Sequence, residues 1–169
     1  MKTLYAPWRE DYTNSVTGAD DRQESAQIAD CVFCTIAKNK DQDAQNFVLQ
    51  RYKTCYIILN KYPYNAGHLL IIPYDHHKNL SAYSEETRIE LITLLNITTL
   101  VLQNTLACEG INIGINMGKA AGAGIPTHLH THVLPRWLGD TNFLPTLAGT
   151  KTISYDLQAL YAKLLPHFV

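Results

Sequence analysis

The stretch His128-Leu129-His130-Thr131-His132-Val133-Leu134 places three histidines at strict alternate positions in a largely apolar frame. Side chains at positions i, i+2 and i+4 of a β-strand point to the same face of the sheet. Three imidazoles on one face are costly in a core, since each ring nitrogen needs a partner. Imidazole is also well suited to nucleophilic and acid–base chemistry near neutral pH. The stretch therefore predicts an active-site strand over Leu129–Leu134.

The whole chain sets few further limits. Its 169 residues suit one domain, and a net charge of −1 gives no global attraction for nucleic acid or an anionic membrane. The apolar runs are shorter than a bilayer span, and no apolar targeting segment follows Met1-Lys2. Two of the four cysteines form a Cys-x-x-Cys pair and two stand alone, which favours a reducing, cytoplasmic compartment. We therefore expect a cytoplasmic protein that binds neither nucleic acid nor membrane.

Alternating and helical patterns predict the secondary structure. Five β-strands, one long helix and one C-terminal helix are expected, which is an α+β fold with a mainly antiparallel sheet. Ser84 would cap the start of the long helix and Gly110 would occupy the C′ position at its end. The strands are predicted at Phe47–Gln50, Cys55–Asn60, His68–Pro73, Ile111–Met117 and Leu129–Leu134, the long helix at residues 84–109 and the last helix at Tyr155–Leu165.

Cys31-Val32-Phe33-Cys34 is the second feature with chemical meaning. Two thiolates at this spacing can bind one zinc ion, but a complete structural site needs two further ligands, which must be histidines here. A redox pair is the alternative, although the motif follows a polar segment instead of a strand. His76 could join the cysteines only if the fold brings them together. The triad itself is also a possible metal site, because imidazole is a common zinc ligand.

Residues 118–124 (GKAAGAG) form a loop of small residues directly before the histidines. Such a loop lets backbone N–H groups approach a phosphate closely. It lacks the spacing of a Walker A loop, and a plain tight connection is the alternative interpretation. Its position beside the triad favours phosphate binding.

Taken together, these motifs resemble the histidine triad (HIT) family of nucleotide hydrolases and transferases. The His-φ-His-φ-His-φ-φ stretch carries the resemblance, and Gly67–Pro73 is similar to a second strand motif of the family. Leu4–Arg9 and Pro135–Phe143 resemble a bacterial branch that includes diadenosine-polyphosphate phosphorylases and hydrolases. The resemblance implies a HIT domain over residues 31–152, preceded by an arm and flexible linker (1–30) and followed by a C-terminal helix packed on the domain (153–169).

The resemblance also implies roles for individual residues. His130 would attack the α-phosphorus of a dinucleoside polyphosphate and form a covalent nucleotidyl intermediate, and His132 would stabilise charge on the phosphate oxygens. Pro126 lacks an N–H, and Thr127 is the only hydroxyl in the loop just before the triad. The residues expected to bind substrate are Asn60, His68, Asn116, Gly124, Ile125 and Thr127.

The same resemblance implies a structural zinc held by Cys31, Cys34, His76 and His128, no organic cofactor, and a homodimer with the long helix near its interface. Three alternatives remain open at this point. The protein could be a nucleotide-binding regulator with negligible turnover, a nucleoside phosphoramidase, or a metal-dependent protein whose triad holds the metal. Neither the acceptor, water or phosphate, nor the base preference follows from the sequence.

Overall fold

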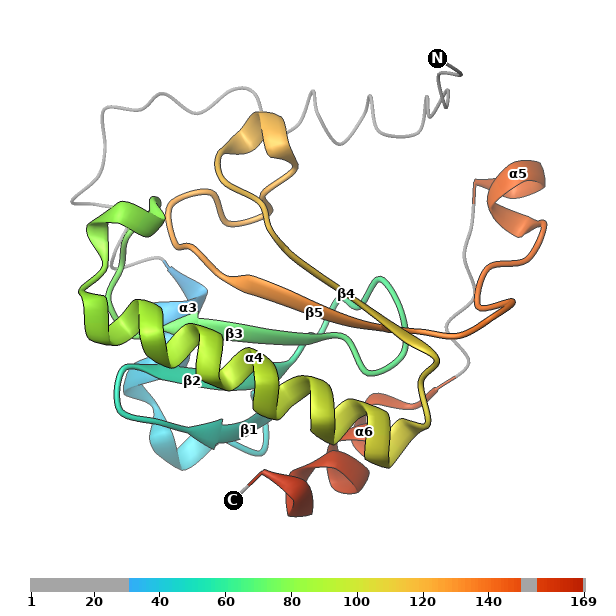
Figure 1. The fold of residues 1–169 in the computed structure, drawn as a ribbon, viewed down its shortest axis with the longest axis horizontal. Helices are drawn as coiled ribbons and strands as arrows, with labels where there is room; N and C mark the ends of the chain where they lie inside the picture. The colour runs from blue at the N-terminus through green and yellow to red at the C-terminus, as the bar shows by residue number, and fades with distance from the viewer. Residues whose placement is uncertain (1–30, 150–154, 169) are drawn as a thin grey trace.

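Five strands form one antiparallel sheet in the order β1-β2-β3-β5-β4 (Figure 1). The computed structural model describes residues 31–149 and 155–168; the arm and linker expected at residues 1–30 lie outside the described residues. The α+β prediction with a five-stranded sheet is confirmed. The strands are β1 (Val48–Arg51), β2 (Cys55–Leu59), β3 (Leu69–Pro73), β4 (Gly110–Ile115) and β5 (Thr131–Arg136).

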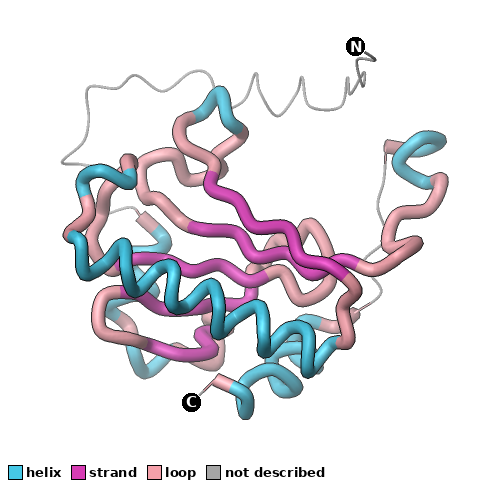
Figure 2. Tube along the Cα trace, in the orientation of Figure 1, coloured by secondary structure: helices cyan, strands magenta, loops and turns pink. Residues whose placement is uncertain are grey.

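Strands β2 and β3 are buried on both faces because helices cover both sides of the sheet. One face packs against α4 (Glu85–Leu106) and α6 (Leu157–Leu164), with Ile57, Leu69 and Val133 in this core. The other face packs against α3 (Val32–Lys38), with Tyr56 and Leu70 among its buried residues. Figure 2 shows α4 running along the strands. Alternate residues of the central strands therefore enter two separate cores.

The long helix begins as predicted and ends earlier. The Ser84 hydroxyl accepts a hydrogen bond from the Thr87 backbone N–H at 3.1 Å, which is an N-cap. The helix ends at Leu106, and Ala107 adopts the left-handed conformation with φ 50°. The prediction that Gly110 is the C′ residue is therefore wrong. Gly110 instead starts β4 and pairs with Arg136, because sheet pairing with β5 begins there.

The triad strand is also shorter at its start than predicted. β5 begins at Thr131, so His128 and His130 precede the strand, and only His132 lies in it. The hydrogen bonds between β3 and β5 do not continue before Thr131, because the Leu129 backbone N–H donates to the His77 carbonyl at 2.8 Å instead. The β3 carbonyl that would continue the sheet, that of Pro73, accepts from the His128 side chain instead.

The smaller elements add two points. Helices α3 and α5 (Leu144–Ala148) were not expected from the sequence. The described residues also contain four short 3-10 helices, the last of them directly after α6: Lys40–Gln42, Leu80–Ala82, Lys119–Ala121 and Leu165–His167. Helix α4 has the length and mean hydropathy (1.3) of a membrane span, although Leu91, Leu94 and Leu102 pack on the sheet. Length and hydropathy are weak evidence, so the absence of a membrane partner stays a prediction.

Candidate active site and metal centre

Two cysteines and two histidines from three segments converge beside the sheet. Cys31 and Cys34 lie at the start of α3, His76 follows β3, and His128 precedes β5. Their ligand atoms all lie within 4.8 Å of one another. The Cys34 sulfur is 3.2 Å from His76 Nδ1, and the Cys31 sulfur is 3.4 Å from His128 Nδ1. The fold thus brings together the four residues predicted as metal ligands.

The hydrogen bonds around this cluster suit a metal ion. His128 Nε2 lies 2.9 Å from the Pro73 carbonyl oxygen, which can only accept, so Nε2 carries the proton. The Nδ1 lone pair then faces both sulfur atoms. Burial lowers the pKa of His128 to about 4, which keeps the ring neutral as a ligand must be. Two cysteines and two histidines at such distances are the donor set of a tetrahedral structural zinc site, and an orienting carbonyl on a ligating histidine is typical.

His130 is held in the tautomer that a nucleophile requires. Its Nδ1 lies 2.9 Å from the His128 carbonyl oxygen, so Nδ1 donates and Nε2 carries the lone pair. The ring is 5% exposed and packs against Phe33, with the ring centroids 5.0 Å apart. Burial lowers the pKa of His130, so the ring is neutral at pH 7.

A chain of hydrogen bonds also fixes the proton positions of His68 and His132. The Tyr64 backbone N–H donates to His68 Nδ1 at 3.1 Å, so the His68 proton is on Nε2. His68 Nε2 donates to His132 Nδ1 at 2.9 Å. Because His132 accepts at Nδ1, its own proton is on Nε2. That buried nitrogen has no hydrogen-bond partner among the described residues, so it is available to donate to a ligand.

The imidazole rings of His68 and His132 are both neutral. Burial, with His132 nearby, lowers the pKa of His68 to about 3, and burial with His130 nearby lowers that of His132 to about 4. Asn60, which was predicted to bind substrate, lies at the end of this series of hydrogen bonds, with its Nδ2 3.2 Å from His68 Nδ1. The site therefore offers one neutral nitrogen lone pair, at His130, and one neutral N–H donor, at His132.

The remaining predicted substrate-binding residues line the segment before the triad. Asn116 follows β4 and is half-buried, Gly124 is exposed, and Thr127 is half-buried. Ile125 packs against the core that contains α3, and its carbonyl accepts from the His128 N–H at 3.4 Å. No hydrogen bond within the described part of the chain joins Asn116 or Thr127 to the triad. Their roles in binding substrate stay predictions.

Sequence reasoning missed two aromatic residues at the site. Tyr64 stacks on His132, with ring centroids 5.6 Å apart and 22° between the planes, and 54% of Tyr64 is exposed. Phe33 contacts both His128 and His130, with ring centroids 5.5 Å and 5.0 Å apart. Two signals in the sequence could have pointed to these residues. Phe33 lies inside the Cys-x-x-Cys motif, and Tyr64 follows Pro63 and lies four residues before His68.

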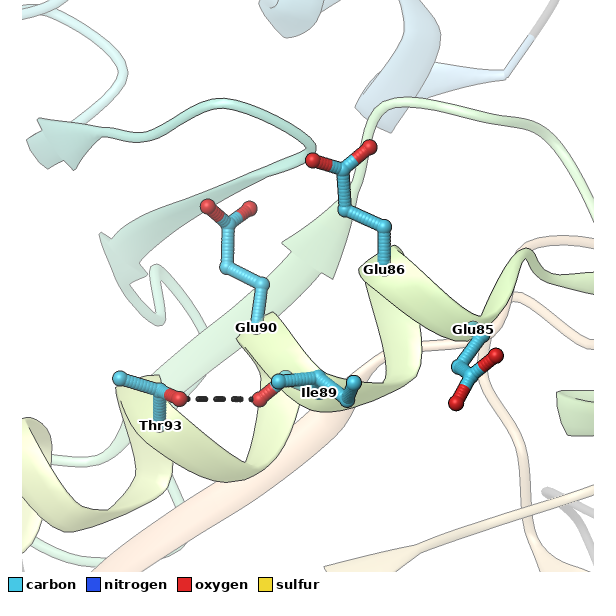
Figure 3. A pocket seen from close by; sticks show the side chains of 5 residues that line it. All are labelled: Glu85, Glu86, Ile89, Glu90 and Thr93. Carbon is cyan, nitrogen blue, oxygen red and sulfur yellow. Dashed lines mark hydrogen bonds between the residues drawn. The ribbon is translucent and has the colours of Figure 1, made fainter.

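A surface pocket on α4 is a poor alternative site for a nucleotide. Three of its five lining residues are glutamates, and Figure 3 shows the side chains of Glu86 and Glu90 leaving the helix toward the same side. Three carboxylates would repel a polyphosphate. Glu90 accepts hydrogen bonds from the Thr54 N–H and hydroxyl, so it already has a structural role. The full lining is Glu85, Glu86, Ile89, Glu90 and Thr93.

Comparisons with known proteins identify relatives of this chain. An AP-4-A phosphorylase of Mycobacterium tuberculosis is 35% identical over 153 residues, which span 90% of this chain and 77% of the relative. An adenylylsulfatase of Arabidopsis thaliana is 30% identical over 128 residues, spanning 73% of this chain and 61% of the relative. These relatives are named for activities on nucleotides.

The structural comparison agrees with the sequence comparison. A Zn-bound histidine triad family protein from Mycobacterium smegmatis superposes with a TM-score of 0.66 and 28% identity, covering 82% of this chain and 93% of that one. The HIT domain family model matches residues 41–137, which include His68, His76 and all three triad histidines. The chain therefore belongs to the histidine triad (HIT) family.

Proposed function

We propose that this protein cleaves dinucleoside polyphosphates at the α-phosphate through a covalent nucleotidyl intermediate on His130. The observation that carries the proposal is the hydrogen bond from His130 Nδ1 to the His128 carbonyl, which leaves Nε2 as a neutral nucleophile. The 35% identity to a protein named AP-4-A phosphorylase supports the substrate class.

The steps follow from the two tautomers. His130 Nε2 attacks the α-phosphorus and displaces the rest of the polyphosphate, so one P–N bond forms as one P–O bond breaks. His132 Nε2–H donates a hydrogen bond to an α-phosphate or bridging oxygen as negative charge develops there. An incoming oxygen from water or inorganic phosphate then forms a P–O bond to the same phosphorus as the P–N bond to His130 breaks, which releases a nucleoside mono- or diphosphate, and the proton carried by the incoming oxygen passes to solvent. The ring nitrogen lone pair is restored and the cycle closes.

The neutral state of His132 also favours this reaction over phosphoramidate cleavage. A neutral imidazole N–H donates a hydrogen bond well but is a very weak acid, so it protonates a departing amine poorly. A polyphosphate carries its own charge and leaves without a proton. Thr127 is the only side-chain hydroxyl just before the triad. The phosphoramidase and the slow nucleotide-binding regulator remain the alternatives for the experiment below.

In this proposal Cys31, Cys34, His76 and His128 hold a structural zinc. With four protein ligands the metal has no open position, and when bound it supplies a cross-link among α3, the β3–α4 connection and the triad segment. A fixed His128 would also fix the orientation of the proposed nucleophile, because the His128 backbone carbonyl accepts a hydrogen bond from His130 Nδ1. The zinc-bound relative supports the assignment. No organic cofactor is proposed.

We further propose a homodimer in the cytoplasm, acting without nucleic acid or membrane. β4 pairs with β5 on one side only, and Ile113 on this edge strand is 50% exposed. Exposed sheet edges are normally covered, and α4 also presents Ile89 and Ile92 to solvent. Sedimentation analysis tests the dimer, and an Ile113→Lys variant should shift it toward the monomer.

The reaction is tested by incubating the protein with diadenosine tetraphosphate, with and without inorganic phosphate, and identifying the nucleotides released. ATP with AMP indicates hydrolysis, and ATP with ADP, formed only with phosphate, indicates phosphorolysis. Mass spectrometry should detect an adenylyl adduct on His130. The His130→Ala variant should be inactive, whereas the exposed His167→Ala variant should keep full activity. Tight nucleotide binding with negligible turnover would support the regulator, and preferential cleavage of adenosine phosphoramidate would support the phosphoramidase.

A further inference from the structure

Helix α3 carries two of the four proposed metal ligands, yet it is poorly stabilised by its own sequence. It has seven residues, and its N-cap Cys31 makes no side-chain capping hydrogen bond; at the other end the Asn39 backbone N–H is the cap, donating to the Thr35 carbonyl at 3.1 Å. Isolated helices shorter than about 12 residues are marginal in water, so α3 depends on tertiary contacts for its position. The contacts that hold α3 therefore also place the two sulfur atoms.

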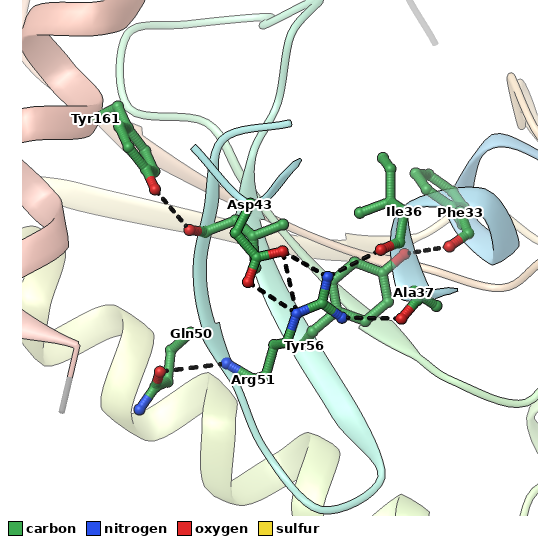
Figure 4. A network of polar contacts seen from close by, with 9 residues as sticks. Phe33, Ile36, Ala37, Asp43, Gln50, Arg51, Tyr56 and Tyr161 are labelled. Atoms are coloured by element: carbon green, nitrogen blue, oxygen red, sulfur yellow. Dashed lines mark hydrogen bonds and ion pairs between the residues drawn. The ribbon is translucent and has the colours of Figure 1, made fainter. Parts of the chain in front are cut away.

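Arg51, on β1, makes the polar contacts that hold the end of this helix (Figure 4). Its guanidinium donates to the Ile36 carbonyl at 2.8 Å and the Ala37 carbonyl at 3.2 Å. The same group donates to both carboxylate oxygens of Asp43, at 2.6 and 2.9 Å. The Arg51 side chain is only 14% exposed. One planar cation thus joins the last turn of α3, the segment after it and the sheet edge.

Tyr56, on β2, also holds α3 in place. Its hydroxyl donates to the Phe33 carbonyl at 2.8 Å, and the Arg51 guanidinium lies over its ring at 5.5 Å. Both residues lie on neighbouring strands, and their contacts hold α3 at residues 33, 36 and 37. Cys34 lies between these contacts, so a displaced α3 would move its sulfur away from His76 and His128.

We propose that Arg51 is a positioning residue for the metal centre: through the Ile36 and Ala37 carbonyls it holds α3 so that the Cys31 and Cys34 sulfur atoms face His76 and His128. This inference rests on the proposed zinc site. The position of α3 also matters for the proposed nucleophile, because Phe33, on the same helix turn, packs its ring on His130. Loss of Arg51 should weaken zinc binding before it affects the rest of the fold.

The test compares zinc affinity, measured by competition with a chromogenic chelator, in the full-length wild type and in Arg51→Met. Loss of a group that orients metal ligands typically weakens affinity by about 10- to 100-fold, and we expect a loss in that range. Arg51→Lys should be intermediate, because its ammonium keeps the attraction to Asp43 but lacks the rigid planar fork of donors with which Arg51 binds the carboxylate and both carbonyls. The absorption of a bound Co²⁺ ion reports the geometry of the same site independently of activity.

Two controls separate positioning from general stability. Lys53→Met removes an exposed cation two residues away, which pairs with Glu86. Leu164→Ala weakens the core on the opposite face of the sheet, where α6 packs. Both variants should keep the zinc affinity and Co²⁺ spectrum of the wild type. If Arg51→Met binds zinc as the wild type does, or if Leu164→Ala weakens zinc binding equally, the inference is wrong.

Two further outcomes are also decisive. If Arg51→Met does not fold, Arg51→Lys and Asp43→Asn take its place: weakened zinc binding in these folded variants supports the inference, and unchanged binding in both overturns it. If the wild type itself binds no zinc, the proposed metal site fails, and the role of Arg51 fails with it. These results are distinguishable because the wild type is measured first.

Discussion

Replacing His68 by phenylalanine tests whether the hydrogen-bond chain fixes the proton of His132. Phenylalanine keeps an aromatic ring in a position that is fully buried, but it removes the Nε2–H that donates to His132 Nδ1 at 2.9 Å. A buried acceptor left without a donor costs about 1–3 kcal/mol. The Tyr64 N–H and the Asn60 amide also lose an acceptor, but both are only partly buried and can reach water.

The ring of His132 can then carry its proton on either nitrogen. Losing about 1.4–2.7 kcal/mol of stabilisation for the Nε2–H form corresponds to a 10- to 100-fold lower rate, and we expect kcat/KM for diadenosine tetraphosphate to fall in that range. The assay follows product nucleotides by chromatography, and ¹⁵N NMR of the imidazole rings reports the tautomer of His132 directly.

The exposed residue His167 provides a matched control, since His167→Phe makes the same substitution outside the site. It should leave both measurements unchanged. The reasoning is refuted if His68→Phe keeps kcat/KM within twofold of the wild type while His132 remains protonated on Nε2. A lower rate with an unchanged tautomer would instead locate the effect in packing against Tyr64.

Three further perturbations have outcomes that the structure predicts. The pKa of His68 falls from 6.5 to about 3 on folding, so the unfolded chain takes up a proton first as the pH falls below 6.5. His68 alone should therefore lower the free energy of unfolding by about 2 kcal/mol at pH 5 relative to neutral pH, and a urea-unfolding difference between wild type and His68→Phe that does not depend on pH contradicts a buried, neutral ring at His68. Cys31→Ser should abolish stoichiometric zinc binding, measured by elemental analysis, and remove the rise in Tm that zinc gives the wild type; zinc bound one per chain in this variant contradicts the ligand set. Gly67→Ala should destabilise by about 1–3 kcal/mol, because φ is +72° and the new Cβ would lie 2.5 Å from Leu106 Cδ1; a variant with the unfolding midpoint of the wild type refutes this.

The sequence could predict the fold class because its patterns are local. Continuous short apolar runs locate β2 and β3 to within one residue, and Ser84 locates the start of α4. The end of α4 was misplaced because Ala107, and not a glycine, adopts the left-handed conformation. The strand carrying the triad was predicted too early, since the loss of ladder hydrogen bonds at Pro73 and Leu129 depends on partners more than 50 residues away in the chain.

The sequence by itself determined which residues have the required chemistry: the spacing of the three histidines and the Cys-x-x-Cys pair limited the site to a few side chains. Only the tertiary structure decided their protonation and their partners. His68 meets His132 across 64 residues, and Arg51 meets the end of α3 across 14–15 residues. Spacing indicates which side chains share a strand face or a helix turn, whereas a tautomer depends on the acceptor that the folded chain places beside each ring nitrogen.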